Sequence, residues 1–218
     1  KMILSTQIIK TQEGPSIGQC CGGSRHAEKT RQSPGIQRSL NEKILNFKLD
    51  NLFIFGAGHI GQELSSRSTD LDFNVHLIDS RNDYLKMQKV KKVTLIYANS
   101  PWMLIKNLPK ESYYIILTHS HDYDFKIINE ILNINSFRFI GLIGSKTKMK
   151  RFSNRLIKLR YMQSKINEIE CPIGLKNISS KKPAEIAISI IGRLLEYRSS
   201  LSSIKLDDKK NLKKINEQ

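Results

Sequence analysis

The sequence predicts an α/β fold with a doubly wound parallel sheet. A continuous apolar run at residues 52–55 leads directly into a glycine-rich turn, and further strand-like and helix-like segments alternate after it. A strand that is buried on both faces of a parallel sheet is apolar throughout, as this run is. Alternating strands and helices indicate parallel strands joined by crossover helices.

The elements follow one another in a regular order. Strands are predicted at residues 52–55, 73–78, 93–97, 113–117 and 137–143, and helices at 59–68, 125–132, 148–159 and 183–195. The last helix has the clearest signals, because Pro183 occupies its first turn and Glu185 lies near its positive end. The apolar stripe of this helix comprises Ile186, Ile190 and Leu194.

The glycine-rich turn at residues 56–61 reads GAGHIG and matches the pattern G-x-G-x-x-G. Gly56 permits a tight turn, Gly58 lets a pyrophosphate approach the backbone, and Gly61 lets the helix pack closely on the strand. Asp79 ends the next strand, 79 − 56 = 23 residues on, where an acidic side chain conventionally accepts ribose hydroxyls. The pattern predicts a Rossmann-like domain, although glycines that serve packing alone would look the same.

The chain divides into three parts. Residues 1–50 form an irregular segment with frequent glycine and proline and too few apolar residues for a core, interpreted as the remnant of an N-terminal domain and a linker. Residues 51–198 form the Rossmann-like domain. Residues 199–218 are lysine-rich and are expected to be a disordered basic tail.

Polar residues follow the predicted strands, where ligands bind in open α/β sheets. His119 and His121 follow the strand at 113–117 and could shuttle protons or bind a metal, while the nearby aspartates could simply cap the next helix. Ser145 and Lys146 open a later helix and could hold an oxyanion, or the lysine could be a solvated loop charge. Arg81 could pair with a phosphate or lie in solvent.

Two adjacent cysteines, Cys20 and Cys21, lie between glycines in the sequence GQCCGG at residues 18–23. Flexible and accessible thiols suit sulfur chemistry or a thiophilic metal such as molybdenum or copper. They could also be incidental small residues of a glycine-rich loop. The total of three cysteines is no disulfide framework, so we expect a reducing, cytoplasmic setting.

The net charge is +16, from 36 basic and 20 acidic residues. The charge is spread along the chain without a recognition motif or an aromatic stacking surface, so we expect no nucleic-acid partner, whereas an anionic small ligand is compatible with it. No apolar run reaches the roughly 20 residues that span a bilayer, so we expect no membrane association.

Seven motifs in this order resemble the xanthine dehydrogenase accessory protein family of the XdhC/CoxI type. They are GQCCGG (18–23), FGAGHIG (55–61), DSR (79–81), THSHD (118–122), GLIGSK (141–146), CPIGL (171–175) and KPAEIA (182–187). Three departures stand out. The upstream domain expected before residues 18–23 is absent, residues 24–51 match poorly, and the usual Asp-Pro-Arg is Asp79-Ser80-Arg81.

The resemblance implies a cofactor chaperone more than a self-sufficient enzyme. Such a protein binds the molybdenum cofactor, as molybdopterin or its dinucleotide, while a cysteine desulfurase supplies sulfur, and delivers it to apo xanthine dehydrogenase or a related molybdenum hydroxylase. Homo-oligomers are compatible with this role. The resemblance implies that Cys20 or Cys21 contacts molybdenum, and the other candidate cofactor-binding residues are Gly56, Gly58, His59, Gly61, Asp79, Arg81, His119, His121, Ser145 and Lys146.

An alternative is an NAD(P)-dependent oxidoreductase that uses the same Rossmann loop. Asp79 would then bind the ribose of the nucleotide, and His119 or His121 would have to serve as the acid–base residue.

Overall fold

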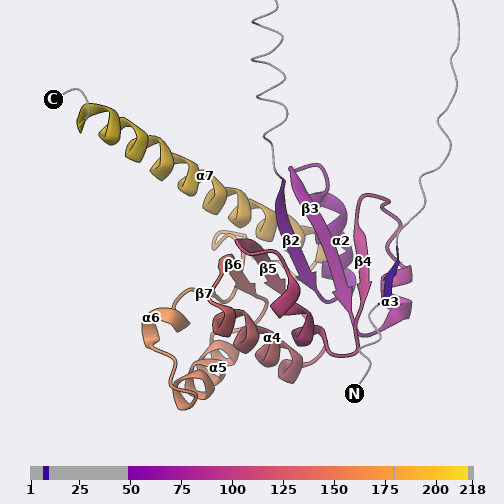
Figure 1. Cartoon of the computed structure of the whole chain (residues 1–218). Helices are drawn as coiled ribbons and strands as arrows, with labels where there is room; N and C mark the ends of the chain where they lie inside the picture. Colours follow the sequence, from indigo (N-terminus) through magenta and orange to yellow (C-terminus); the bar gives the residue numbers. More distant parts are fainter. Residues whose placement is uncertain (1–6, 10–48, 179, 216–218) are drawn as a thin grey trace, which may run out of the picture.

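The computed structural model describes residues 7–9, 49–178 and 180–215. In these residues a seven-stranded sheet has the order β1-β4-β3-β2-β5-β6-β7, with helices on both faces (Figure 1). The strands are β1 (Gln7–Ile9), β2 (Asp50–Phe55), β3 (Phe73–Asp79), β4 (Thr94–Tyr97), β5 (Ser112–Ile116), β6 (Phe137–Leu142) and β7 (Ile169–Glu170). The helices are α2 (His59–Ser68), α3 (Asn82–Lys86), the 3-10 helix η1 (Pro101–Asn107), α4 (His121–Ile134), α5 (Lys146–Lys158), α6 (Gln163–Ile166) and α7 (Pro183–Ile215).

Strands β2 to β7 are all parallel, and β1 alone is antiparallel, on the outer edge of β4. From the central strand β2 the chain builds β3 and β4 on one side and then returns to build β5, β6 and β7 on the other. This is the doubly wound Rossmann order, and it confirms the predicted fold class. The direction of winding changes between β2 and β5.

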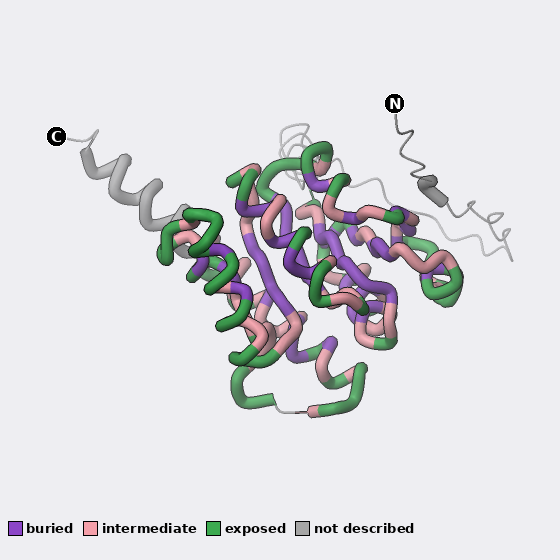
Figure 2. The backbone as a smooth tube through the Cα atoms, turned by 90° about the horizontal axis from the view of Figure 1, so that it is seen from below, coloured by how far each residue is buried: buried purple, intermediate pink, exposed green. Residues whose placement is uncertain are grey.

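Two layers of apolar side chains cover the sheet. On one face, strand residues such as Phe53 and Ile116 pack against η1, α4, α5 and α6. On the other face, strand residues such as Leu77 and Ile115 pack against α2, α3 and α7. The strands are therefore buried on both faces, which explains apolar runs such as residues 52–55, although the first half of β3 alternates and exposes Asn74. Figure 2 shows buried backbone along the strands, with exposed residues on the surrounding helices and loops.

The structure differs from the sequence prediction at the C-terminal end. The residues expected to form a disordered tail from 199 onward continue α7 as far as Ile215, and the helix extends away from the sheet (Figure 1). Its first half packs on α2 and the sheet through Ala187, Ile190 and Leu194. Because this packed half supplies the helix nucleus, elongation through residues without glycine or proline is favourable.

Strand β1 lies inside the segment 1–50 that was predicted to be irregular. The helices that the structure describes include none long and apolar enough to cross a membrane.

Candidate functional site

A cavity of about 530 Å³ opens at the carboxyl ends of β2, β5 and β6. It lies at the point where the winding of the sheet changes direction, the usual ligand site of this fold. The volume is within the range of small-molecule sites. The lining residues are Gly58, His59, Ile60, Leu117, Thr118, His119, His121, Ile143, Gly144, Ser145, Lys148 and Pro183.

Backbone hydrogen bonds between the strand ends hold the walls of this cavity in register. Leu117 donates its N–H to the carbonyl oxygen of Phe55 at 2.9 Å, and Ile143 donates to Ile116 at 2.9 Å. The turns after β2, β5 and β6 are thereby fixed next to one another. The cavity wall is therefore backbone held by hydrogen bonds between the strand ends, with side chains projecting from it.

The three glycines of the first turn have different environments. Gly56 has a φ of 123°, and a Cβ there would overlap the carbonyl group of Leu117, so only glycine fits this turn. A Cβ at Gly61 would overlap the carbonyl oxygen of Gly56, which accounts for the close contact of α2 with the loop. A Cβ at Gly58 would meet no atom within 4 Å, and Gly58 lines the cavity.

The amino end of α2 faces the same cavity. Gly58 is the N-cap and supplies no side-chain acceptor, while His59 and Ile60 of the first turn line the cavity wall. The first N–H groups of a helix have no partner within the helix and carry a partial positive charge. This end of α2 is therefore suited to an anion, as the glycine pattern predicts.

His119 and His121 both line the cavity from the turn after β5. Both side chains are exposed, and the rings of His119 and Tyr123 are T-shaped to each other with 5.4 Å between centroids. The helix cap in this turn is Ser120, whose Oγ accepts a hydrogen bond from the N–H of Tyr123. The aspartates of the motif are thus free of the capping role that the sequence left open for them.

Asp124 and Lys148 form a buried ion pair at the base of the cavity. The Lys148 ammonium lies 2.6 Å from the Asp124 carboxylate, and their side chains are 11 % and 0 % exposed. The other carboxylate oxygen of Asp124 accepts hydrogen bonds from the N–H and the hydroxyl of Thr118. Lys148 also donates to the carbonyl oxygen of Ile143 at 2.9 Å. The pair therefore ties the turns after β5 and β6 together.

Ser145 and Lys146 have different positions at the start of α5. Ser145 is the N-cap, accepts a hydrogen bond from the N–H of Lys148, and lines the cavity. Lys146 is exposed and is absent from the cavity lining. The lysine in the cavity wall is Lys148, two residues further on.

Comparison with known proteins agrees with this geometry. Residues 52–194 match the family described as the XdhC Rossmann domain, about two thirds of the chain. The chain belongs to the XdhC family. The resemblance drawn from the sequence motifs is thereby confirmed, and the matched residues contain the glycine turn and every residue that lines the cavity.

Two relatives extend this comparison. The uncharacterized protein YqeB of Escherichia coli strain K12 is 23 % identical over 150 residues, which cover 68 % of this chain and 27 % of YqeB. A crystal structure named as a xanthine dehydrogenase from Bacillus halodurans is 25 % identical with a TM-score of 0.58, over 69 % of this chain and 43 % of that one. The chain therefore spans less than half the length of either relative.

In this XdhC domain Asp79 and Arg81 pair with each other. The Asp79 carboxylate accepts four hydrogen bonds, from the N–H of Ala57, the N–H of Arg81, and Nε and Nη2 of the Arg81 guanidinium. Burial raises the pKa of Asp79, but the hydrogen bonds from Arg81 and Ala57 outweigh it, and the pKa lies below its usual value of 3.8. Neither residue is part of the cavity lining.

The structure describes one of the three cysteines, Cys171. Cys20 and Cys21 lie outside the described residues, so their contact with molybdenum stays a prediction. Cys171 is a free, half-buried thiol whose Sγ lies 3.8 Å from the carbonyl oxygen of Ser145. Burial raises the pKa of Cys171; Lys148 lowers it and Asp124 raises it further. No group of three or more potential metal-ligating side chains occurs in the described part of the chain.

Lys148 is the functional candidate that sequence reasoning missed. The pattern that reveals it is the spacing of Lys148, Phe152 and Leu156 at i, i+4 and i+8, which places the lysine on the buried face of α5. Its partner Asp124 lies two residues beyond the end of the THSHD motif.

Proposed function

We propose that this chain is an accessory protein of xanthine dehydrogenase or a related molybdenum hydroxylase. In this proposal the cavity at the ends of β2, β5 and β6 binds the molybdenum cofactor, which is held during sulfuration by a cysteine desulfurase and then delivered to the apoenzyme. The single observation that best supports the proposal is that the XdhC family match coincides with a cavity built for an anionic ligand.

The phosphate end of such a cofactor fits the residues present. Gly58 leaves the backbone uncovered, the first turn of α2 presents N–H groups, and Lys148 brings a cation into the wall. Two of the three N–H groups of Lys148 are engaged by Asp124 and Ile143, and the third is left for an oxyanion. His119 and His121 supply hydrogen-bonding rings at the cavity mouth for the heterocycle of the ligand.

The environment of Asp79 favours this ligand over NAD(P). A carboxylate has about four acceptor positions, and the four hydrogen bonds to Asp79 fill them. The ribose of a nicotinamide nucleotide would have to displace Arg81 to reach it. A cofactor with its phosphate on α2 requires no such displacement.

The experiment compares the full chain purified from cells with and without molybdenum-cofactor synthesis. Bound pterin is released, oxidised and quantified by its fluorescence, and NADPH binding is titrated on the same samples. We expect pterin to copurify only from the competent cells. Saturable NADPH binding with turnover, and no retained pterin, would refute the proposal in favour of the oxidoreductase alternative.

Three variants locate the ligand. Lys148→Met is expected to lose pterin, while Lys150→Met, an exposed lysine on the same helix, is expected to keep it. Because Lys148→Met leaves a buried carboxylate alone, the neutral double variant Asp124→Asn/Lys148→Met provides a folded reference. Full pterin retention by the double variant would show that the ligand lies elsewhere.

Cys20 and Cys21 are tested separately. Their change to serine should leave pterin binding in place but weaken retention of molybdenum, which is measured by elemental analysis of the same samples, since a thiolate is a soft ligand for this metal. Unchanged molybdenum content in the serine variant would remove the thiols from the proposal.

A further inference from the structure

Helix α5 has an unusual distribution of charge. Its 13 residues include six cations and no carboxylate, namely Lys146, Lys148, Lys150, Arg151, Arg155 and Lys158. The neighbouring helix α4 differs, since it has Asp122, Asp124 and Glu130 against a single lysine. The basic character of α5 is therefore more than a reflection of the general composition of the chain.

Most of these cations are unpaired. Lys148 pairs with Asp124, and Arg155 lies 4.0 Å from Asp122 and over the ring of Phe125. The other four form no ion pair among the residues that the structure describes, and all four are exposed. Like charges one turn apart destabilise a helix, and cations near its amino end oppose the helix dipole. Helix stability therefore does not account for Lys146 and Lys150.

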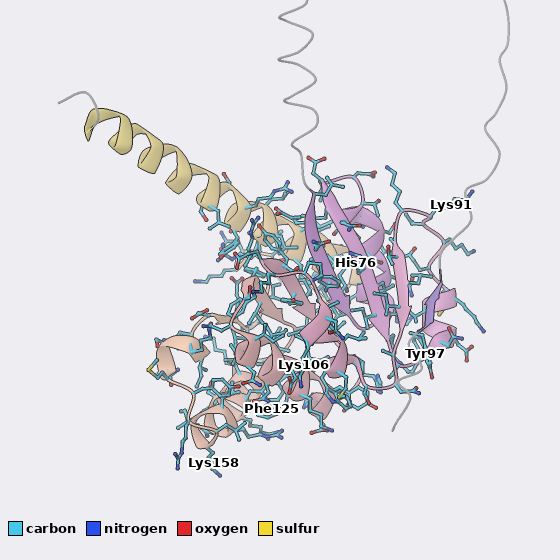
Figure 3. The ribbon with its side chains drawn as sticks, in the orientation of Figure 1. His76, Lys91, Tyr97, Lys106, Phe125 and Lys158 are labelled. Carbon is cyan, nitrogen blue, oxygen red and sulfur yellow. The ribbon has the colours of Figure 1, made fainter. Side chains whose placement is uncertain are left out.

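An apolar patch lies at the far end of the same helix. Ile157, Leu159 and Met162 are 50 %, 54 % and 74 % exposed, at the end of α5 and in the turn that leads to α6. Lys158 and Arg160 are interspersed with them, and Figure 3 shows Lys158 pointing away from the sheet. Exposed apolar groups beside charged ones are typical of protein-binding surfaces.

We infer that the exposed side of α5, together with the turn into α6, is the docking surface for an acidic protein. The occupant is the apoenzyme that receives the ligand of the cavity, and in this respect the inference rests on the proposed function. The first turn of α5 belongs to the cavity wall through Ser145 and Lys148, and its last turn lies about 20 Å further on. A partner that covers α5 therefore reaches from the apolar patch to the cavity mouth.

Charge complementarity identifies the occupant as another protein rather than a segment of this chain. Residues 1–48 contain eight Lys and Arg against three Glu, and residues 202–218 contain five Lys against three Asp and Glu. Both segments repel α5, and a second copy of α5 would repel it as well. A surface with carboxylates around an apolar centre complements the helix in both respects.

The test measures binding of the full chain to apo xanthine dehydrogenase of the same organism, prepared from cells without cofactor synthesis. The first variant pair is Lys150→Glu/Lys158→Glu, with Lys89→Glu/Lys110→Glu as the control of equal charge change on exposed lysines elsewhere. The second pair is Ile157→Gln/Met162→Gln, with Met87→Gln/Met103→Gln as the control on similarly exposed apolar residues. Circular dichroism checks that each variant is folded.

Both α5 variants are expected to weaken binding by about tenfold or more, and the charge variant also to reduce its salt dependence, while both controls bind as the wild type does. Wild-type affinity in both α5 variants, or no binding by the wild type, would overturn the inference. Binding to phosphatidylglycerol vesicles that requires Lys150 and Lys158, without binding to the apoenzyme, would overturn it in favour of a lipid surface.

Pterin retention is measured on the same proteins and keeps the two proposals distinct. The α5 variants are expected to retain pterin. Apoenzyme binding through α5 by a protein that retains no pterin would leave the docking surface intact and remove the cofactor function. Pterin retention by a wild-type protein that does not bind the apoenzyme would leave the cofactor function intact and remove the docking surface.

Discussion

Two buried carboxylates lie near the point where the winding of the sheet changes direction. They differ in whether their cationic partner lines the cavity. Asp79, at the end of β3, is 3 % exposed and Asp124, in α4, is fully buried; each pairs with a cation and accepts a backbone N–H. Arg81 lies two residues from Asp79 and fills its remaining acceptor positions outside the cavity. Lys148 comes from another helix, 24 residues from Asp124, and lines the cavity.

If the cavity binds a ligand as proposed, the second pair is in a position to contact it and the first is not. The Asp79–Arg81 pair is local and closed, and its contact with Ala57 fixes the glycine turn from outside. The Asp124–Lys148 pair joins two helices and keeps one N–H of the lysine for the cavity. Sequence reasoning alone would favour Asp79, because its position matches a familiar pattern.

The largest effect is expected from Lys148→Met. Removal of one partner of a buried ion pair leaves a charge unpaired and should lower the free energy of unfolding by about 3–5 kcal/mol. Urea denaturation measures this, with Lys150→Met as a control that should differ little from the wild type. Asp124→Asn/Lys148→Met should recover most of the loss. A double variant as unstable as the single one would contradict the ion-pair explanation.

Asp79→Asn should also lower the free energy of unfolding, by about 2–3 kcal/mol, because hydrogen bonds to the charged carboxylate are lost. Pterin retention should be unchanged, since the residue does not line the cavity. Asp83→Asn, at an exposed carboxylate nearby, is the matched control. The comparison of the two pairs breaks down if Asp79→Asn abolishes ligand retention while the free energy of unfolding stays the same.

Sequence reasoning located the walls of the cavity but not its buried centre. Residues 56–61, the THSHD turn and Ser145 are local motifs, and the parallel order of strands brings their turns together. The choice between Lys146 and Lys148 depends on where α5 begins, and the structure places its start two residues before the predicted one. The pairing of Asp124 with a lysine 24 residues away is a tertiary contact that local patterns do not encode.

Element length decided how much of the fold could be predicted. Each of the five predicted strands and four predicted helices occurs in the structure, because each strand contains an apolar run and each helix several residues of helical periodicity. The elements without a prediction are short: β1, α3, η1, α6 and β7. Periodicity carries little information over two to seven residues, and tertiary packing determines these elements instead.

A partly buried histidine on β3 contributes to the acid sensitivity of the fold. His76 stacks on Phe53 with 4.5 Å between ring centroids, and neither ring nitrogen has a hydrogen-bond partner among the described residues. Burial lowers the pKa of His76 from 6.5 to about 4. The folded state therefore favours the neutral ring. Its stabilising effect is complete above pH 6.5 and is lost as the pH falls toward 4.

The wild type should lose about 2 kcal/mol more than His76→Phe between these pH values, a figure reduced from full linkage because the ring is partly exposed. The loss through Asp79, whose pKa is below 3.8, should follow only at lower pH. Urea denaturation at a series of pH values measures both windows. Parallel curves for the two proteins between pH 6.5 and 4 would exclude His76 as the group responsible.

The smallest effect on stability and the sharpest test of the cavity come from Gly58→Ala. The added methyl group meets no atom of the protein, and the φ of −68° suits alanine, so the free energy of unfolding should stay the same or rise by about 0.4–1 kcal/mol. Gly61→Ala should instead destabilise, because its Cβ overlaps the carbonyl oxygen of Gly56. If a phosphate lies against the backbone at Gly58, the alanine occupies that space and pterin retention falls although the fold is intact. Retention equal to the wild type would move the phosphate away from α2 and leave Lys148 as the anion site.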